Sequence, residues 1–298
     1  MPERMHEGQL PIDDDLVRHL VATQHPRWAG RAIREVASVG TVNAVFRLGD
    51  DLCVRLPLVA SGAASLEREL AWLPWLAARL SVPVPEPVAT GAPDERYPLP
   101  WAIYRWLPGT TLASAPPAGP ALADDLAALV AAVRALDPAG APRAENRWAL
   151  RHLDPSIRYG LDRLGDDGID VARSTAAWDE ALAAPAYAGP PTWVHGDLLA
   201  ANLLVADGRL AGVLDWGGSG TGDPAADLYP AWVLDRAGRQ RFRSALGVDD
   251  ASWARGRGWA LRTPIQGLPY YRDTNPGFAA MSRAVLDQVL WGADGASG

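Results

Sequence analysis

The arrangement of apolar residues changes near residue 108, and this change constrains the fold more than any other feature of the sequence. Before it, short apolar and β-branched runs predict strands at 35–39, 44–48, 52–56 and 101–107. One helix is expected among them at 66–80, with a kink at Pro74. After it, apolar residues at helical spacing predict a helix at 122–136. Further helices are expected at 156–164, 176–184, 225–235, 240–246, 251–262 and 277–290. This order indicates an α+β protein with a β-rich N-terminal lobe (1–108), a larger α-helical C-terminal lobe (109–298) and a ligand cleft between them.

A β hairpin interrupts the helical half, with strands at 203–205 and 210–214. Asn202 precedes its first strand and Asp215 follows its second, and paired strands lie about 5 Å apart. Their amide and carboxylate oxygens are hard ligands, which predicts a Mg²⁺ site. Asp197, on the loop that enters the hairpin, is placed to orient a substrate hydroxyl and accept its proton during phosphoryl transfer.

The chain contains no lysine, and the 28 residues counted as lysine or arginine are all arginine. Schiff-base enzymes and Walker A nucleotide-binding proteins are therefore excluded. The net charge of −7 argues against a nucleic-acid partner and mildly favours a cationic substrate. The proline-rich uncharged run 106–123 predicts a linker rather than a membrane span.

The N-terminal residues predict the setting in which the protein works. Residues 13–15 are acidic, as expected at the start of a solvated helix. The first fifteen residues carry no signal-peptide pattern, and the single cysteine, Cys53, cannot form an internal disulfide. We therefore expect a cytoplasmic protein with no membrane partner.

The motif His195-x-Asp197-x₄-Asn202, followed by Asp215-x-Gly217, resembles the catalytic and metal loops of the protein-kinase-like fold. The segment 222–228 is similar to the signature of the aminoglycoside and macrolide phosphotransferases. This resemblance runs from the N-terminal hairpin to the segment 270–276, and so covers most of the chain. It implies a two-lobed protein-kinase-like fold.

The resemblance also implies roles for individual residues in the C-terminal half. Asp197 is expected to be the catalytic carboxylate, and Asn202 and Asp215 the ligands of Mg²⁺. His195 is expected to support the catalytic loop. Asp223 is expected to fix the metal loop or the following helix, which is a structural role.

Arg55 stands where the third strand of this fold normally supplies a lysine to the nucleotide phosphates. Alternation along 52–56 places Arg55 and Cys53 on the face opposite Leu52, Val54 and Leu56. Arginine can bridge phosphate oxygens in a bidentate manner. Its expected partner is Glu69, and Glu67 is the alternative, because the sequence leaves the phase of the helix open.

The rest of the nucleotide site is expected in two segments. A loop at 38–43 would cover the phosphates, with its contacts at Gly40, Thr41 and Asn43. The segment 104–109 matches the crossover between lobes, where the backbone of Arg105 and Leu107 would bind the purine edge. Tyr104 falls behind the base, and a bulky residue there resembles family members that prefer GTP to ATP.

These features predict an enzyme that moves the γ-phosphate of ATP or GTP to a hydroxyl of a small molecule, best interpreted as an aminoglycoside or a related antibiotic. Asp227, Tyr270 and Tyr271 are candidate acceptor contacts, with helix capping and core packing as the alternatives. A macrolide kinase and a metabolite kinase are alternatives within the class. A catalytically inactive nucleotide-binding sensor is an alternative from another class, which the missing lysine favours.

Overall fold

The computed structural model describes residues 5–37, 40–115, 119–145 and 149–292. The chain divides into two compact units. The first holds the chain up to Pro108 together with Gly212–Gly217, and the second holds Gly109–Ala211 and the chain from Gly218 onward. The segment 212–217 differs from the expectation that one lobe runs unbroken from 109 to 298. It joins the first unit because the Val213 amide donates to the Pro83 carbonyl (3.0 Å).

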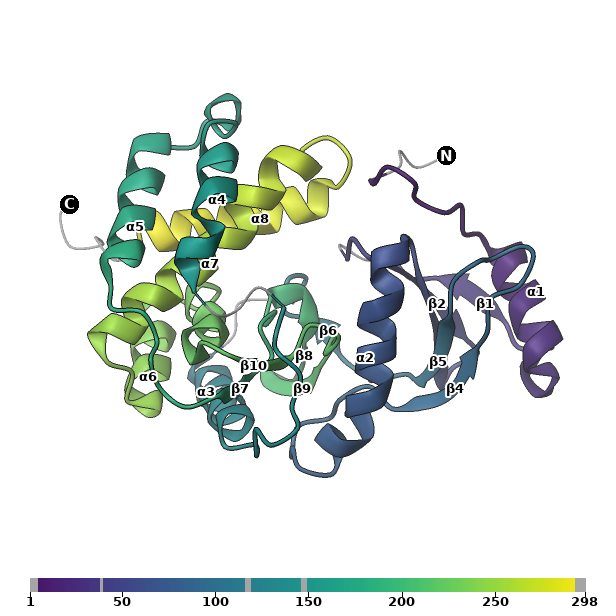
Figure 1. The fold of residues 1–298 in the computed structure, drawn as a ribbon. Helices are drawn as coiled ribbons and strands as arrows, with labels where there is room; N and C mark the ends of the chain where they lie inside the picture. The colour runs from purple at the N-terminus through teal and green to yellow at the C-terminus, as the bar shows by residue number, and fades with distance from the viewer. Residues whose placement is uncertain (1–4, 38–39, 116–118, 146–148, 293–298) are drawn as a thin grey trace. The chain divides into compact units, whose positions relative to one another are not determined.

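The first unit is built on an antiparallel sheet of five strands in the order β1-β2-β3-β5-β4 (Figure 1). The strands are β1 (Ile33–Glu35), β2 (Asn43–Leu48), β3 (Leu52–Pro57), β4 (Pro87–Gly91) and β5 (Trp101–Arg105). The turn between β2 and β3 contains Gly49 at φ 68°, in the left-handed region that glycine adopts without strain. Tyr104 of β5 lies opposite Cys53 of β3.

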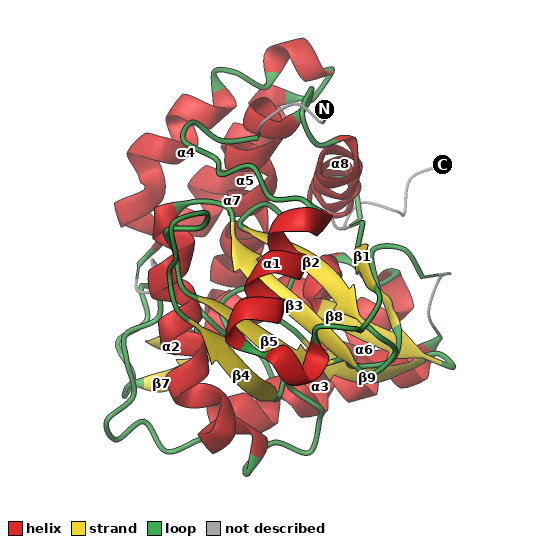
Figure 2. Cartoon of the chain, turned by 90° about the vertical axis from the view of Figure 1, so that its right-hand side faces the viewer, coloured by secondary structure: helices red, strands yellow, loops and turns green. Residues whose placement is uncertain are grey.

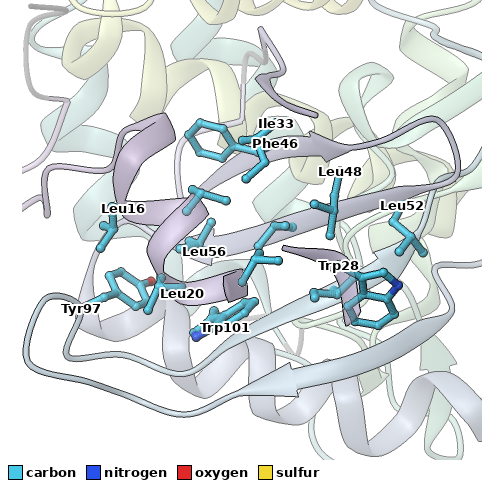
Figure 3. Packing of buried hydrophobic residues seen from close by; sticks show 14 residues of the cluster. Leu16, Leu20, Trp28, Ile33, Phe46, Leu48, Leu52, Leu56, Tyr97 and Trp101 are labelled. Atoms are coloured by element: carbon cyan, nitrogen blue, oxygen red, sulfur yellow. The ribbon is translucent and has the colours of Figure 1, made fainter. Parts of the chain in front are cut away.

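One face of this sheet forms a hydrophobic core with helix α1 (Asp14–Gln24), which lies across it in Figure 2. The predicted alternation in β3 is confirmed, since Leu52, Val54 and Leu56 are buried in this core. Figure 3 shows the α1 leucines packing against the strands and against two aromatic side chains, Tyr97 and Trp101. Each such buried side chain contributes about 1.5–3 kcal/mol to folding. The Asp13 carboxylate accepts a hydrogen bond from the Leu16 amide (2.8 Å), so the predicted helix start is also confirmed.

Helix α2 (Ala60–Ala77) lies on the opposite side of the sheet from α1 (Figure 1). It continues through Pro74 for three more residues and begins six residues before the predicted start at 66. Its first turns consist of small residues, and Gly62 packs closely, since a Cβ there would lie 2.9 Å from Val42. Glu69 is a buried residue of α2 and Glu67 is exposed.

The second unit is largely helical. Its α-helices are α3 (Pro120–Arg134), α4 (Asp154–Leu161), α5 (Val171–Ala183), α6 (Arg236–Leu246), α7 (Asp250–Tyr271) and α8 (Pro276–Leu290). Its strands form two small sheets, β6-β8-β9 and β10-β7, in which the last residues of β9 pass into the first unit. The strands are β6 (Thr110–Thr111), β7 (Thr192–Val194), β8 (Leu203–Ala206), β9 (Arg209–Val213) and β10 (Gly220–Gly222).

Several predicted elements differ from the structure. The first strand is at Ile33–Glu35 rather than 35–39, and Ser38 and Val39 lie outside the described residues. The helix predicted at 225–235 is the 3₁₀ segment η5 (Pro224–Trp232), and Pro230, which has no amide hydrogen, lies within it. Helix α7 runs nine residues past its predicted end at 262 and contains both Pro264 and Pro269. The strands β4, β6 and β10 were not predicted.

Among the described residues, no helix is both long enough and apolar enough to cross a membrane.

Candidate active site

The loop between β7 and β8 carries Asp197 on a constrained backbone. His195, which begins it, is fully buried, and Gly196 adopts φ 78°. The Asp197 amide donates to Nδ1 of His195 (3.2 Å). His195 therefore supports the turn from inside the second unit.

Asn202 orients the carboxylate of Asp197. Its Nδ2 donates both to the Asp197 carbonyl (2.9 Å) and to Oδ2 of the Asp197 side chain (3.0 Å). These two bonds fix the direction of the carboxylate. They also use the amide nitrogen of Asn202, so its oxygen is the atom that remains to bind a cation.

Asp227 binds the backbone of the same loop and has no exposed surface. Its two oxygens accept from the amides of His195 (2.8 Å) and Gly196 (2.7 Å). Burial raises the pKa of Asp227, while His195 and the two amide donors act against that rise. The expectation that Asp227 contacts an acceptor is wrong, because its carboxylate is buried and both oxygens are used by the loop.

Asp223 fixes the segment that follows it, in agreement with a structural role. It accepts from the Ala225 amide (2.9 Å) at the start of η5, and it forms a buried ion pair with Arg255 of α7 (2.9 Å). The two elements pack closely beside this pair, since a Cβ at Gly256 would lie 2.8 Å from Leu228. Asp223 thereby anchors η5 to α7.

A small pocket opens beside Asp197 within the second unit. It is lined by Gly196, Asp197, Leu198, Leu199, Ala226, Tyr229, Trp259 and Thr263. Among these described lining residues, Asp197 supplies the one carboxylate, and the others are mostly apolar or aromatic. The loop, η5 and α7 each contribute to this pocket.

Tyr270 and Tyr271, the predicted acceptor contacts, lie at the end of α7 and are not among the residues that line the pocket. Tyr270 is 54% exposed and packs edge-on against Tyr271 (centroids 4.7 Å apart). Tyr271 in turn contacts Phe278 of α8 (4.8 Å). Tyr271 thus packs between helices, and Tyr270 remains on the surface.

In the first unit, Arg55 pairs with Glu69 rather than with Glu67. Its Nη1 donates to Oε2 of Glu69 (2.5 Å) and its Nη2 to Oδ1 of Asp215 (2.8 Å). With the amide oxygen of Asn43 facing the guanidinium, that oxygen accepts from Nη2 (2.9 Å) and Nε (3.1 Å). Burial opposes the charge on Arg55, but Glu69 and Asp215 raise its pKa, so the guanidinium keeps its charge.

The Glu69 carboxylate connects four parts of the first unit. Besides Arg55 of β3, it accepts from the Tyr104 hydroxyl of β5 (3.2 Å) and from the Trp216 amide (3.1 Å). Burial raises the pKa of Glu69, and the Arg55 guanidinium opposes this rise. Three donors converge on this carboxyl, so the site is built to hold its ionised form.

The predicted metal loop, 215–217, packs tightly on α2. Asp215 has φ 62°, in a left-handed conformation that Asp tolerates better than most residues. Trp216 is buried, and its indole donates to the Val213 carbonyl (3.0 Å). A Cβ at Gly217 would lie 2.0 Å from Oγ of Ser65, so only glycine fits there without displacing the loop.

The remaining predicted nucleotide contacts also lie in the first unit. Gly40 and Thr41 precede β2, and the Thr41 carbonyl contacts the His6 ring (2.6 Å). The Arg105 amide donates to the Glu86 carbonyl (2.9 Å). The Leu107 amide has no hydrogen-bond partner in the part of the chain that the structure describes. Tyr104 is buried, with its hydroxyl on Glu69.

Each of the two predicted magnesium ligands, taken in its own unit, offers an oxygen of the kind that Mg²⁺ prefers. Asn202 offers an amide oxygen, and Asp215 a carboxylate that is 36% exposed. Mg²⁺ prefers hard oxygen ligands and commonly combines one or two protein groups with phosphate oxygens and water. The two donors belong to different units, and each is held in its own unit by the contacts given above.

Sequence reasoning missed four contributors to these sites: Asn43 as a partner of Arg55, Arg255 as the partner of Asp223, and Tyr229 and Trp259 as pocket residues. The position of Tyr229, directly after the signature segment 222–228, was the one available signal. The other three depend on tertiary packing, which local patterns do not encode.

A family model described as the phosphotransferase enzyme family matches residues 33–259. The chain belongs to this phosphotransferase family. None of the curated proteins compared with it gives a match.

Solved structures of similar fold include other phosphotransferases. The GDP complex of wild-type aminoglycoside 2′-phosphotransferase-IIIa has a TM-score of 0.71 at 20% identity and covers 93% of this chain and 98% of that one. A GDP and kanamycin complex of the same type has a TM-score of 0.70 at 20% identity, with 92% and 98% coverage. The macrolide 2′-phosphotransferase MphH from Brachybacterium faecium gives 0.60 at 23% identity, with 93% and 98% coverage. These likenesses confirm the predicted kinase-like fold.

Replacing Asp223 by alanine in this phosphotransferase should lower the free energy of unfolding by about 3–5 kcal/mol, because Arg255 would keep a buried charge without its counter-ion. The matched control is Asp124→Ala, which breaks an exposed pair with Arg241 and should change stability little. Urea unfolding followed by tryptophan fluorescence measures both. If the two variants lost the same free energy of unfolding, the burial of the Asp223–Arg255 pair would not explain its contribution to stability.

Proposed function

We propose that this phosphotransferase moves the γ-phosphate of a nucleoside triphosphate to a hydroxyl of a small molecule, with an aminoglycoside or a related antibiotic as the acceptor. The observation that carries the proposal is the pair of hydrogen bonds from Asn202 to Asp197. They direct a carboxylate on a loop whose two preceding amides are held by Asp227. That carboxylate lines a pocket, as a group that receives an acceptor must.

Asp197 acts on the acceptor hydroxyl. Its carboxylate accepts a hydrogen bond from the hydroxyl and takes the proton as the oxygen attacks the γ-phosphorus. The Asn202 amide keeps the carboxylate in a fixed direction, which reduces the cost of orienting the reacting groups. Asn202 and Asp215 would hold Mg²⁺, which when bound neutralises charge on the phosphates.

Arg55 binds the phosphates of the donor nucleotide. A guanidinium offers donors in a rigid planar fork, so Arg55 can contact phosphate oxygens while Glu69 holds it from behind. The Leu107 amide is suited to bind the purine edge, and Gly40, Thr41 and Asn43 belong to the segment proposed to cover the phosphates. The donor is ATP or GTP. Solved phosphotransferases of similar fold are complexes with GDP, ADP or ATP.

Two features bear on the acceptor in opposite directions. The net charge of −7 favours a polycation such as an aminoglycoside. The tryptophan-rich helical half and the Tyr270–Tyr271 pair favour a bulkier, less charged molecule such as a macrolide. We propose the cytoplasm as the place of action, since the single Cys53 is compatible with a reducing compartment.

A catalytically inactive nucleotide-binding sensor is the second candidate. The missing lysine favours it, because the usual phosphate contact is absent. The position taken by Arg55 and the intact Asp197, Asn202 and Asp215 weigh against it.

Asp197→Asn should lower kcat by about 10²–10⁴-fold, because an amide cannot accept the proton of the acceptor hydroxyl. The assay measures nucleoside diphosphate release with Mg²⁺ and a panel of kanamycin, gentamicin, streptomycin and macrolides. The control is Asp207→Asn in the β8–β9 turn. Asp207 is exposed and has a backbone φ of 50°, which asparagine also tolerates, so this variant should retain full activity. Full activity of Asp197→Asn would contradict the mechanism, and tight nucleotide binding without turnover on any acceptor would favour the sensor.

Wild-type protein should use GTP with a higher kcat/KM than ATP, because buried Tyr104 narrows the space behind the base. Tyr104→Ala should shift the ratio toward ATP, whereas Tyr104→Phe keeps the bulk and should keep the preference. Steady-state kinetics with both nucleotides measure the ratio. Equal use of the two donors, or a preference for ATP in the wild type, would refute this role of Tyr104.

A further inference from the structure

Tyr229 lines the pocket that contains Asp197, and its hydroxyl is buried. The residue is 4% exposed and lines the pocket together with Asp197, Trp259 and Thr263. Its hydroxyl has no hydrogen-bond partner among the residues that the structure describes. A buried hydroxyl without a partner is unfavourable for folding, so its presence in a pocket indicates a partner that arrives with a ligand.

The hydroxyl is available as a donor. Burial first, and then the negative charge of Asp197, raise the pKa of Tyr229 above its ordinary value. The phenol therefore keeps its proton at neutral pH. An oxygen atom of a bound molecule is the partner that such a donor selects.

The position of this hydroxyl is fixed by the same contacts that hold the catalytic loop. Tyr229 lies on η5, two residues after Asp227, which binds the amides of His195 and Gly196. The start of η5 is anchored to α7 by the Asp223–Arg255 ion pair. Tyr229 and Asp197 are thus held beside the pocket by contacts that link the loop, η5 and α7 within the second unit.

We propose that Tyr229 is an acceptor-binding residue whose hydroxyl donates a hydrogen bond to an acceptor oxygen at or beside the hydroxyl that reacts at Asp197. The inference rests on the proposed role of Asp197 and extends it to specificity. It assigns the pocket to acceptors that carry a second oxygen next to the reacting hydroxyl, as in vicinal diols and hydroxy ethers. The apolar lining contributed by Leu198, Leu199 and Trp259 contacts the carbon framework.

The test is Tyr229→Phe, which removes only the hydroxyl. The variant should lower kcat/KM for the acceptor by about tenfold, since one hydrogen bond to the bound acceptor is lost. The KM for the nucleotide should stay within about twofold of the wild type. The melting temperature should equal or exceed that of the wild type, because no bond within the protein is lost.

The matched control is Tyr97→Phe in the first unit. Tyr97 is also buried, but its hydroxyl donates to the Pro57 carbonyl (2.6 Å). This variant should lower the melting temperature and leave acceptor kcat/KM unchanged. Opposite effects in the two variants separate ligand binding from a purely structural role of a buried tyrosine.

Unchanged kcat/KM in Tyr229→Phe, for every panel acceptor that the wild type phosphorylates, would overturn the proposal. If the wild type phosphorylates none of the panel, the proposal of an antibiotic acceptor is rejected, but the role of Tyr229 is not. Tyr229 is then tested with water as the acceptor. Nucleotide hydrolysis without added acceptor should then fall several-fold in Tyr229→Phe, because the hydroxyl orders the water beside Asp197. Hydrolysis equal to that of the wild type would overturn the role of Tyr229.

Discussion

The buried carboxylate of Glu69 is the interaction on which the arrangement of the first unit depends. It lies inside the protein and receives hydrogen bonds from Arg55, Tyr104 and the Trp216 amide. A buried charge is tolerated only when it is paired and hydrogen-bonded, so the three partners must stay in place together. Helix α2, two strands and the loop that carries Asp215 are thereby held at one point. The positions proposed for phosphate and metal binding follow from it.

The second unit uses the same physical device at Asp227. This carboxylate is also fully buried, and it binds two successive amides of the loop that leads to Asp197. The loop therefore does not depend on its own short sequence for its conformation. Each unit fixes a chemically important loop by placing a buried carboxylate behind it. Asp197 and Asp215 themselves are half-buried, and their carboxylates contact Asn202 and Arg55, respectively.

Local patterns predicted part of this arrangement. Alternation in 52–56 identified the face of Arg55, and the hairpin with its flanking Asn202 and Asp215 was recognised from spacing. The choice between Glu67 and Glu69 needed the phase of α2, which extends six residues further toward its N-terminus than its leucines indicate. For Asp227 the sequence left an acceptor contact and a helix cap as alternatives, and its actual contact with the His195 and Gly196 amides depends on tertiary packing. The short strands β4, β6 and β10 carry too few residues for any periodic signal.

The central claim is that an arginine held by Glu69 takes the place of the missing lysine in binding nucleotide phosphates. The most direct measurement is the Kd of Mg²⁺–GTP and Mg²⁺–ATP, by titration calorimetry, for wild type and for the double variant Arg55→Met with Glu69→Gln. Glutamine removes the buried charge but keeps an oxygen that can accept a hydrogen bond from Tyr104 or the Trp216 amide, so the protein should remain folded, as circular dichroism can verify. We expect binding at least about tenfold weaker in the double variant, because the charge-assisted contacts to phosphate are lost. A folded double variant with the Kd of the wild type would contradict this claim.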